Sequence, residues 1–202
     1  MPLLDKLEVA RRQLGTALWL FLEDLDPVSV HTLAGAGGEL SEQLARRAGG
    51  TPFVQHALLT DPGMTPAQYY ALLRRHYNSF KHFTRKDGSS RDDHALLAEF
   101  SDDHNYASLF ISWTDFMAAS PSTPIEAQIF QVWFFCMYPE KLPTNYDPAH
   151  ILSVFPDLLE LDRGGQKNAL KLQIARSRTD GALMMDLRTD NRPLLLGGIQ
   201  GN

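Results

Sequence analysis

Cysteine is almost absent from this chain of 202 residues: Cys136 is the only one, which excludes an intrachain disulfide. It lies in the run IFQVWFFCMY, which predicts a small buried apolar residue rather than a nucleophile. No apolar run approaches the ~18 residues that a membrane-spanning helix needs. We therefore expect a protein that makes no contact with a membrane.

A strong excess of one charge is also lacking. The 24 acidic and 19 basic residues leave a net charge of -5, which argues against indiscriminate binding of nucleic acid. Any contact with RNA would need a local basic patch. The first residues, MPLLDKLEVARRQLG, turn from apolar to charged, which is the reverse of the order in a signal peptide. A cytoplasmic protein is expected.

Helix-start signals, in contrast, are frequent. Four times a capping residue directly precedes a proline, whose missing N–H group is not needed in a first helical turn. Two of these pairs extend to a capping box, with Gln68 and Glu126 as the reciprocal partners. Ser101, followed by two aspartates, is a fifth start. The four pairs are Asp26-Pro27, Thr65-Pro66, Thr123-Pro124 and Asp147-Pro148.

Apolar residues recur at helical spacing after most of these starts. Five main helices are predicted over residues 3–24, 27–47, 66–84, 102–119 and 124–138, and shorter ones near 148–154 and 163–178. The small residues at 34–38 suggest the close approach of another helix or a local break. The fold class is therefore all-α, an antiparallel helical bundle of about five main helices with short C-terminal helices.

The predicted domain organisation is one helical-bundle domain over residues 1–180. Residues 181–202 then form a C-terminal tail that is loosely docked, or disordered after Gly197. The stretch ALMMDL, residues 182–187, could form a strand, but it has no predicted partner.

The predicted helix over residues 66–84 carries the candidate site. At ~100° per residue its aromatic residues and Leu73 cluster on one side, and Arg75, Asn78 and His82 cluster on the other. His76 falls toward the apolar side, where we expect it to make one hydrogen bond. Residues 74–86 contain five Lys or Arg and no Asp or Glu, so the strip is locally basic.

Arg75, the polar His76 after it, and then His82 fit the arginine–x(4–6)–histidine pattern of HEPN domains, which the chain resembles here. The resemblance implies an all-α bundle that dimerises through this strip. Many HEPN domains are metal-independent ribonucleases of toxin–antitoxin and defence systems, and others are non-catalytic binding modules. Separately, the first half of the chain, through NSFKHF, resembles a group of uncharacterised bacterial all-α proteins with an N-x-x-K-H element.

The residue types suit RNA cleavage by the 2′-hydroxyl group. His82 would move the proton, Arg75 would hold the phosphate, and Asn78 would orient His82 or contact the phosphate. Arg74, Lys81 and Arg85 would bind the RNA backbone. No metal or cofactor is expected. The partners implied by the resemblance are a second copy of the chain, RNA, and an antitoxin-like protein.

Two alternatives stay open. The first is a non-catalytic module that binds a protein or a ligand and has the strip at its surface. The second is a metal-binding bundle using Asp103 and His104, although the Glu-x-x-His motif of carboxylate-bridged iron proteins is missing. His31 is predicted to be a core histidine, or a supporting partner of the strip if the helices 27–47 and 66–84 are adjacent. The three tryptophans are assigned to core packing.

Overall fold

The computed structural model describes residues 4–85 and 87–197. They confirm the all-α prediction: eleven α-helices are accompanied by two strands of two residues each. The chain forms two compact units, Met1–Ser120 and Pro121–Asn202. The prediction of one domain over residues 1–180 placed no boundary after Ser120.

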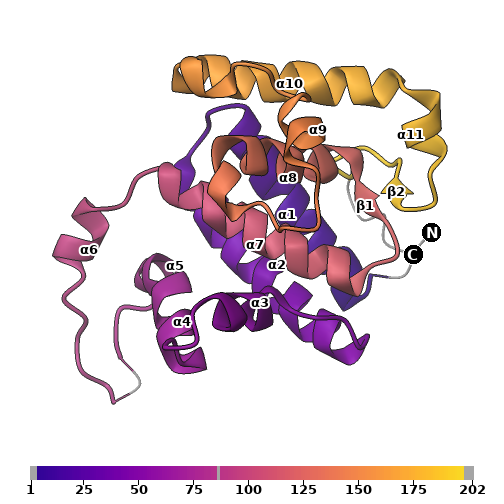
Figure 1. Cartoon of the computed structure of the whole chain (residues 1–202). Coiled ribbons are helices and arrows are strands. Elements are labelled where there is room, and N and C mark those ends of the chain that lie inside the picture. The colour runs from indigo at the N-terminus through magenta and orange to yellow at the C-terminus, as the bar shows by residue number, and fades with distance from the viewer. Residues whose placement is uncertain (1–3, 86, 198–202) are drawn as a thin grey trace. The chain divides into compact units, whose positions relative to one another are not determined.

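The first unit contains seven helices, shown from indigo to rose in Figure 1. They are α1 (Lys6–Leu22), α2 (Pro27–Arg47), α3 (Phe53–Thr60), α4 (Pro66–Leu73), α5 (Arg75–Lys81), α6 (His94–Ala98) and α7 (Asp103–Ala119).

Three long helices, α1, α2 and α7, pack against one another and form the core of the first unit (Figure 1). Fully buried apolar side chains from all three fill it, among them Leu14, Val30 and Trp113. The small residues of α2 mark a close approach, as predicted, and not a break. A Cβ atom on Gly37 would lie 2.7 Å from the Leu14 side chain, and one on Gly38 would lie 2.4 Å from Ser112 Oγ.

Two of the predicted helix starts in this unit have the expected geometry. The Asp26 carboxylate accepts hydrogen bonds from the backbone N–H groups of Val28 and Ser29, at 3.2 and 3.0 Å. Thr65 and Gln68 form the complete capping box. Both caps depend only on neighbours in sequence, which is why the sequence sufficed to find them.

The predicted helix over residues 66–84 is instead two helices that meet at Arg74. The backbone of Arg74 (φ -101°, ψ 7°) ends α4 and begins α5. Helix α5 ends at Lys81, and His82 already has an extended backbone. Residues 83–85 and 87–91 then form the two sides of a small hairpin, in which Arg91 N–H donates to the Phe83 carbonyl at 3.2 Å and Thr84 pairs with Ser90.

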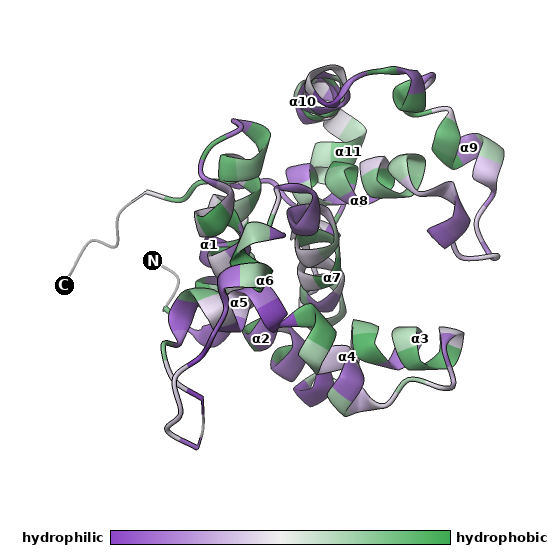
Figure 2. Cartoon of the chain, turned by 90° about the vertical axis from the view of Figure 1, so that its left-hand side faces the viewer, coloured by the Kyte–Doolittle hydropathy of each residue, from purple (hydrophilic) through white to green (hydrophobic). Residues whose placement is uncertain are grey.

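The second unit contains β1 (Thr123–Pro124), α8 (Ile125–Met137), α9 (Pro148–Leu152), α10 (Arg163–Thr179), α11 (Gly181–Met185) and β2 (Thr189–Asp190). Short 3-10 turns occupy Pro139–Lys141 and Leu158–Glu160. Helix α8 is largely apolar, as its green ribbon in Figure 2 shows, and it packs against α9 and α10. The Trp133 indole N–H donates to the Gln166 carbonyl of α10 at 3.1 Å.

One prediction for this unit was wrong, and the possible strand at ALMMDL is not formed. Thr123 does not cap α8: it lies in β1, and Glu126 forms an ion pair with Arg178 of α10, with 2.7 Å between Nε and Oε1. Residues 182–185 of ALMMDL are helical rather than extended, and β2 beyond them pairs in parallel with β1. The predicted disorder after Gly197 concerns residues 198–202, which lie outside the described residues.

Two further expectations concern Cys136 and the membrane. The Cys136 thiol is buried and donates to the Ile151 carbonyl at 3.4 Å, and burial raises its pKa to about 11. A thiol held in its protonated form is not a nucleophile at neutral pH. Within the described part of the chain, no helix combines the length and apolar character that crossing a bilayer requires.

Candidate functional site

Arg75, the first residue of α5, is exposed and meets a histidine of another helix. Its Nη2 atom lies 3.4 Å from Nε2 of His104, in the first turn of α7. A guanidinium can only donate hydrogen bonds, so this contact favours the tautomer of His104 in which Nε2 is the acceptor. On the other side of the ring, Nδ1 lies 3.1 Å from both the backbone nitrogen and the carbonyl oxygen of Ser101, so it can accept from the first or donate to the second. The tautomer with its proton on Nδ1 is the one that leaves Nε2 able to accept from Arg75.

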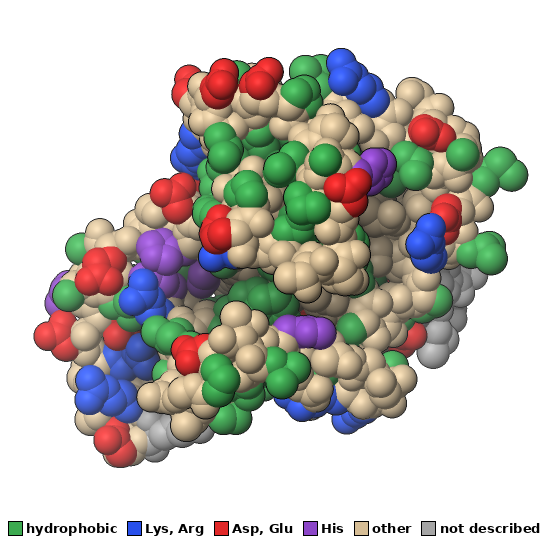
Figure 3. All heavy atoms as spheres, viewed as in Figure 1, with side chains coloured by type: hydrophobic (Ala, Val, Ile, Leu, Met, Phe, Trp, Pro, Cys, Tyr) green, Lys and Arg blue, Asp and Glu red, His purple; other side chains and the backbone are tan. Residues whose placement is uncertain are grey.

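His104 also belongs to a group of five rings, which we call the histidine cluster. His76 is 2% exposed, and its ring centroid lies 4.5 Å from that of His104 and 6.0 Å from that of His31. Phe80 and Phe100 fill the space around them. Figure 3 shows histidine side chains beside Lys and Arg side chains on the left of the molecule, over α5 and α6. The cluster comprises His31, His76, Phe80, Phe100 and His104.

Both buried histidines are neutral at pH 7. Burial lowers the pKa of His31 to about 4, against the opposing effect of its hydrogen bond to Asn105 Oδ1 at 3.0 Å. Burial, followed by the nearby His104, Arg75 and His31, lowers the pKa of His76 to about 4. His31 is thus a buried histidine with a partner, as predicted, and α2 contacts α5, which was the condition for a supporting role of His31. The hydrogen bond expected for His76 is missing: neither ring nitrogen has a partner in the described structure.

The other residues of the predicted strip are spread along α5. Asn78 is half-buried in the middle, where its backbone N–H donates to the Arg74 carbonyl at 2.8 Å. His82 is exposed and lies directly after the last helical residue, at the opposite end of α5 from Arg75. The prediction that Arg75, Asn78 and His82 share one helix face required the helix to continue through His82. Because the backbone of His82 is extended, this requirement is not met. Arg75 and His82 therefore occupy the two ends of one short helix.

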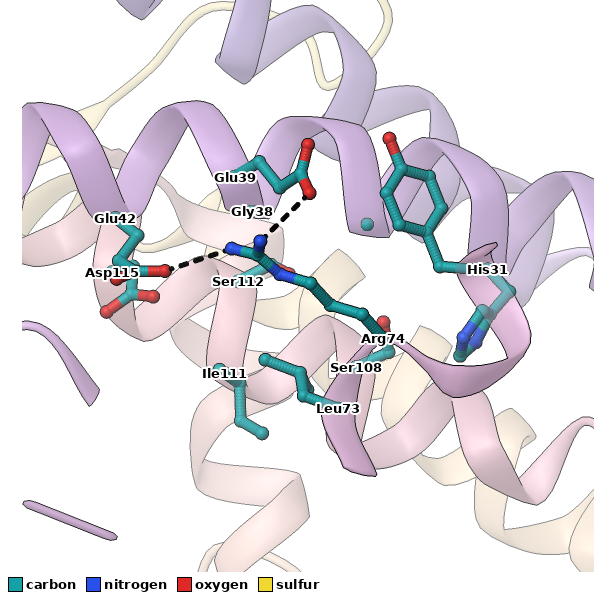
Figure 4. A pocket seen from close by; sticks show the side chains of 12 residues that line it. His31, Gly38, Glu39, Glu42, Leu73, Arg74, Ser108, Ile111, Ser112 and Asp115 are labelled. Atoms are coloured by element: carbon teal, nitrogen blue, oxygen red, sulfur yellow. Dashed lines mark hydrogen bonds and ion pairs between the residues drawn. The ribbon is translucent and has the colours of Figure 1, made fainter. Parts of the chain in front are cut away.

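Two of the three residues predicted to bind RNA are already paired with carboxylates of α2. Arg74 lies 3.3 Å from Glu39 and 3.5 Å from Glu42, and Figure 4 shows its guanidinium between them. Lys81 lies 4.0 Å from Glu39 and 3.8 Å from the centre of the Tyr77 ring. These acids precede the strip by about thirty residues in sequence, so counting charges over residues 74–86 missed them. The strip therefore carries less unpaired positive charge than the sequence predicted.

The pocket that Arg74 spans also contains a carboxyl group that the sequence analysis did not single out. Asp115 of α7 is buried, and burial raises its pKa to about 7, although the Phe53 N–H donates to it at 2.7 Å. The nearby Glu42 raises the pKa of Asp115 further. The pocket encloses about 30 Å³, which is room for a water molecule or two. It is too small to hold a nucleotide.

The hairpin after α5 presents an aromatic ring to solvent. Phe83 is 83% exposed, between His82 and the residues that lead to Arg85. Its backbone is held by the hydrogen bond from Arg91, and the hairpin is closed by the bond from Arg85 N–H to the Ser89 carbonyl at 2.8 Å. In the predicted continuous helix over residues 66–84, this ring lay on the apolar face. Because α5 ends at Lys81, the ring projects from a loop instead.

A metal centre finds no support among the described residues. Over residues 4–85 and 87–197, no three side chains of the types His, Cys, Asp and Glu are placed so that they could hold a metal ion. The alternative built on Asp103 and His104 therefore lacks its required third ligand. Comparisons of the chain with protein-family models, with curated proteins and with solved structures found no match.

Proposed function

We propose that the protein is a HEPN-like, metal-independent endoribonuclease whose active site centres on Arg75. The observation that supports this most directly is the contact between the exposed Arg75 guanidinium and Nε2 of His104. A guanidinium can hold two phosphate oxygens and stays charged at all relevant pH values. Its neighbour is an imidazole whose Nε2 faces the same point and is a proton acceptor in the tautomer protonated at Nδ1. Together they supply a phosphate-binding group and a proton acceptor.

The reaction is an internal transesterification. His104 Nε2 accepts the proton of a ribose 2′-hydroxyl group while the 2′-oxygen attacks the adjacent phosphorus. The bond from phosphorus to the 5′-oxygen breaks, and an acid must protonate that oxygen as it leaves. The products are a 2′,3′-cyclic phosphate and a 5′-hydroxyl end. Arg75 balances the negative charge that grows on the phosphoryl oxygens.

A second copy of the chain would supply the acid. Helix α5 has seven residues, so Arg75 and His82 at its ends are separated by ~10 Å, which is long for joint action on one phosphate. In a two-fold symmetric dimer with antiparallel α5 helices, His82 of each copy faces Arg75 of the other. Each of the two resulting sites then has Arg75 and His104 from one copy and His82 from the second.

The substrate that fits these surroundings is single-stranded RNA. Phe83 offers an exposed aromatic face on which an unpaired base can stack, and Arg85 follows it for a backbone phosphate. Arg74 and Lys81 form ion pairs with Glu39 and Glu42, so they contribute less to RNA binding than unpaired cations would.

Cleavage should be measured on single-stranded RNA in EDTA. We expect the purified protein to cleave RNA and to leave DNA of the same sequence intact, since DNA lacks the 2′-hydroxyl group. His104→Gln and His82→Ala are each expected to lower the single-turnover rate by about 100-fold, the typical effect of losing one acid–base group. His94→Gln, at an exposed histidine of α6, is the matched control and should cleave normally.

The shared site gives a sharper test with two inactive proteins. Mixing equal amounts of Arg75→Ala and His82→Ala puts one intact site in each mixed dimer. Half of the dimers are mixed and one of their two sites is intact, so about a quarter of the wild-type activity should return. No recovery after exchange of subunits, shown by mass spectrometry, would contradict the placement of His82 in the second copy.

Phe83→Ala is expected to raise KM for single-stranded RNA by about tenfold with little change in kcat, as for the loss of one stacked base. Leu59→Ala, at a 78% exposed leucine of α3, is the control for a general loss of apolar surface. A change in kcat alone would contradict the stacking role.

A non-catalytic binding module is the second candidate function. The observation that favours it is the pairing of Arg74 and Lys81 with Glu39, which reduces the free positive charge of the strip. If no RNA is cleaved by a dimeric, folded protein, and an antitoxin-like protein partner binds with Arg75 in the interface, this candidate replaces the nuclease.

A further inference from the structure

We propose that the histidine cluster is an acid-sensitive latch: it holds α5 and the segment 94–104 on the three-helix core at neutral pH and releases them on acidification. The proposal concerns conformation and holds whether or not the protein cleaves RNA.

The cluster joins α2 to the segment before α7 and to α5, which Tyr77 and the ion pairs of Arg74 and Lys81 also hold. His31 comes from α2, His76 and Phe80 come from α5, and Phe100 comes from the segment between α6 and α7. Phe100 contacts all three histidines, with ring centroids 5.2 to 5.6 Å apart. Helix α6, next to Phe100, has no buried residue at all. The cluster is therefore the main apolar contact of this segment with α2.

A second proton on either buried histidine is disfavoured in the closed form. Both ring nitrogens of His76 are buried without a hydrogen-bond partner in the described structure, so an imidazolium there would lack both water and an acceptor. His31 is 4% exposed and is hydrogen-bonded to Asn105, which is itself buried and also bound to the Asp102 carboxylate at 2.7 Å. Protonation of His76 therefore requires its ring to reach solvent, and burial disfavours protonation of His31.

The charged groups around the cluster oppose protonation as well. Arg75 from α5 lies beside His76, and His104 from α7 lies beside both buried histidines, so each adds a positive or potentially positive charge. Three carboxyl groups line the pocket on the other side of His31. Glu39 and Glu42 of α2 form ion pairs with Arg74. The third, Asp115 of α7, accepts a hydrogen bond from the backbone N–H of Phe53.

Opening should stay local. The core formed by α1, α2 and α7 keeps its own fully buried apolar side chains, such as Leu14, Leu109 and Trp113, whether or not α5 is docked. Phe80 and Phe100, in contrast, are only half-buried in the closed form. Segments with few buried contacts open at the lowest free energy. The latch is thus the part of the first unit that acid should release first.

The sign of the pH dependence follows from the histidine pKa values. Both are near 4 in the closed form and return toward 6.5 when the rings reach water. Between these values the open form binds more protons, so the latch is closed above pH 6.5 and weakens as the pH falls toward 4. The opening equilibrium should rise by up to about tenfold per pH unit for each of the two histidines.

Hydrogen–deuterium exchange of the full chain tests this proposal. Protection in peptides from α5 and residues 94–104, corrected for intrinsic exchange rates, should fall between about pH 7 and about pH 4, while protection in α1 stays constant. His76→Phe keeps the ring and removes the proton site, so it should halve the slope of log protection against pH. His94→Gln, at an exposed histidine in the same segment, should leave the slope unchanged.

A parallel loss of protection in α1 would show global acid unfolding and overturn the latch, as would a slope unaffected by His76→Phe. Should His76→Phe not fold, the wild-type protein still decides the matter through its histidine ring signals in NMR. Values near 4 for His31 and His76 support the proposal, and values near 6.5 for both overturn it.

Discussion

Replacing Arg75 by alanine is expected to lower RNA cleavage in EDTA by about 1,000-fold, which is more than the loss of either histidine. Two effects add. The phosphate loses its fixed positive charge, and His104 loses the donor that holds its Nε2 toward the substrate. The measurement is the single-turnover rate on single-stranded RNA, with circular dichroism to confirm the fold.

Two further variants make this result specific. Arg75→Lys keeps the charge but cannot bind two oxygens in one plane, so it should recover only about tenfold of the lost rate. Arg47→Ala is the control: it removes an exposed arginine from the last turn of α2, outside the proposed site, and should cleave RNA normally. Equal rates for Arg75→Ala and the wild type would exclude Arg75 from the site.

The sequence identified one half of this candidate site and missed the other. Arg75 stood out because it begins the arginine–x(4–6)–histidine pattern in a locally basic stretch. His104, its contact, lies 29 residues away, on a different helix, and had been considered only as a metal ligand. The break at Arg74 brings them together, yet no glycine or proline marks it. The ion pairs of Arg74 with Glu39 and Glu42, which are tertiary contacts, accompany the break and could not be predicted from local signals.

The fold shows the same division between local and tertiary causes. The caps at Asp26 and Thr65 were predictable because all their atoms lie within a few residues. The capping box predicted at Thr123 failed because Glu126 is bound by Arg178, which is 52 residues away. The bounds of α2 were predicted to the residue, since a proline and a pair of glycines enclose it.

All three tryptophans were predicted to lie in the core, but the structure places two of them in different surroundings. A stability experiment can compare the two. Trp113 of α7 is 0% exposed and packs edge-on against Phe116, with ring centroids 5.2 Å apart. Trp19 of α1 is 36% exposed. Both lie in the first unit, so one unfolding transition reports on both.

Trp113→Ala is expected to lower the free energy of unfolding of the first unit by about 3–5 kcal/mol, because it leaves a large cavity among α1, α2 and α7. Trp19→Ala should cost less than about 1 kcal/mol, since much of that ring is already hydrated. Urea unfolding at pH 7 measures both. Trp113→Phe should fall close to the wild type, because the Trp113 indole N–H has no partner in the described structure and its loss removes a buried unsatisfied donor. Equal losses for Trp113→Ala and Trp19→Ala would contradict the packing of α7 at the centre of this core.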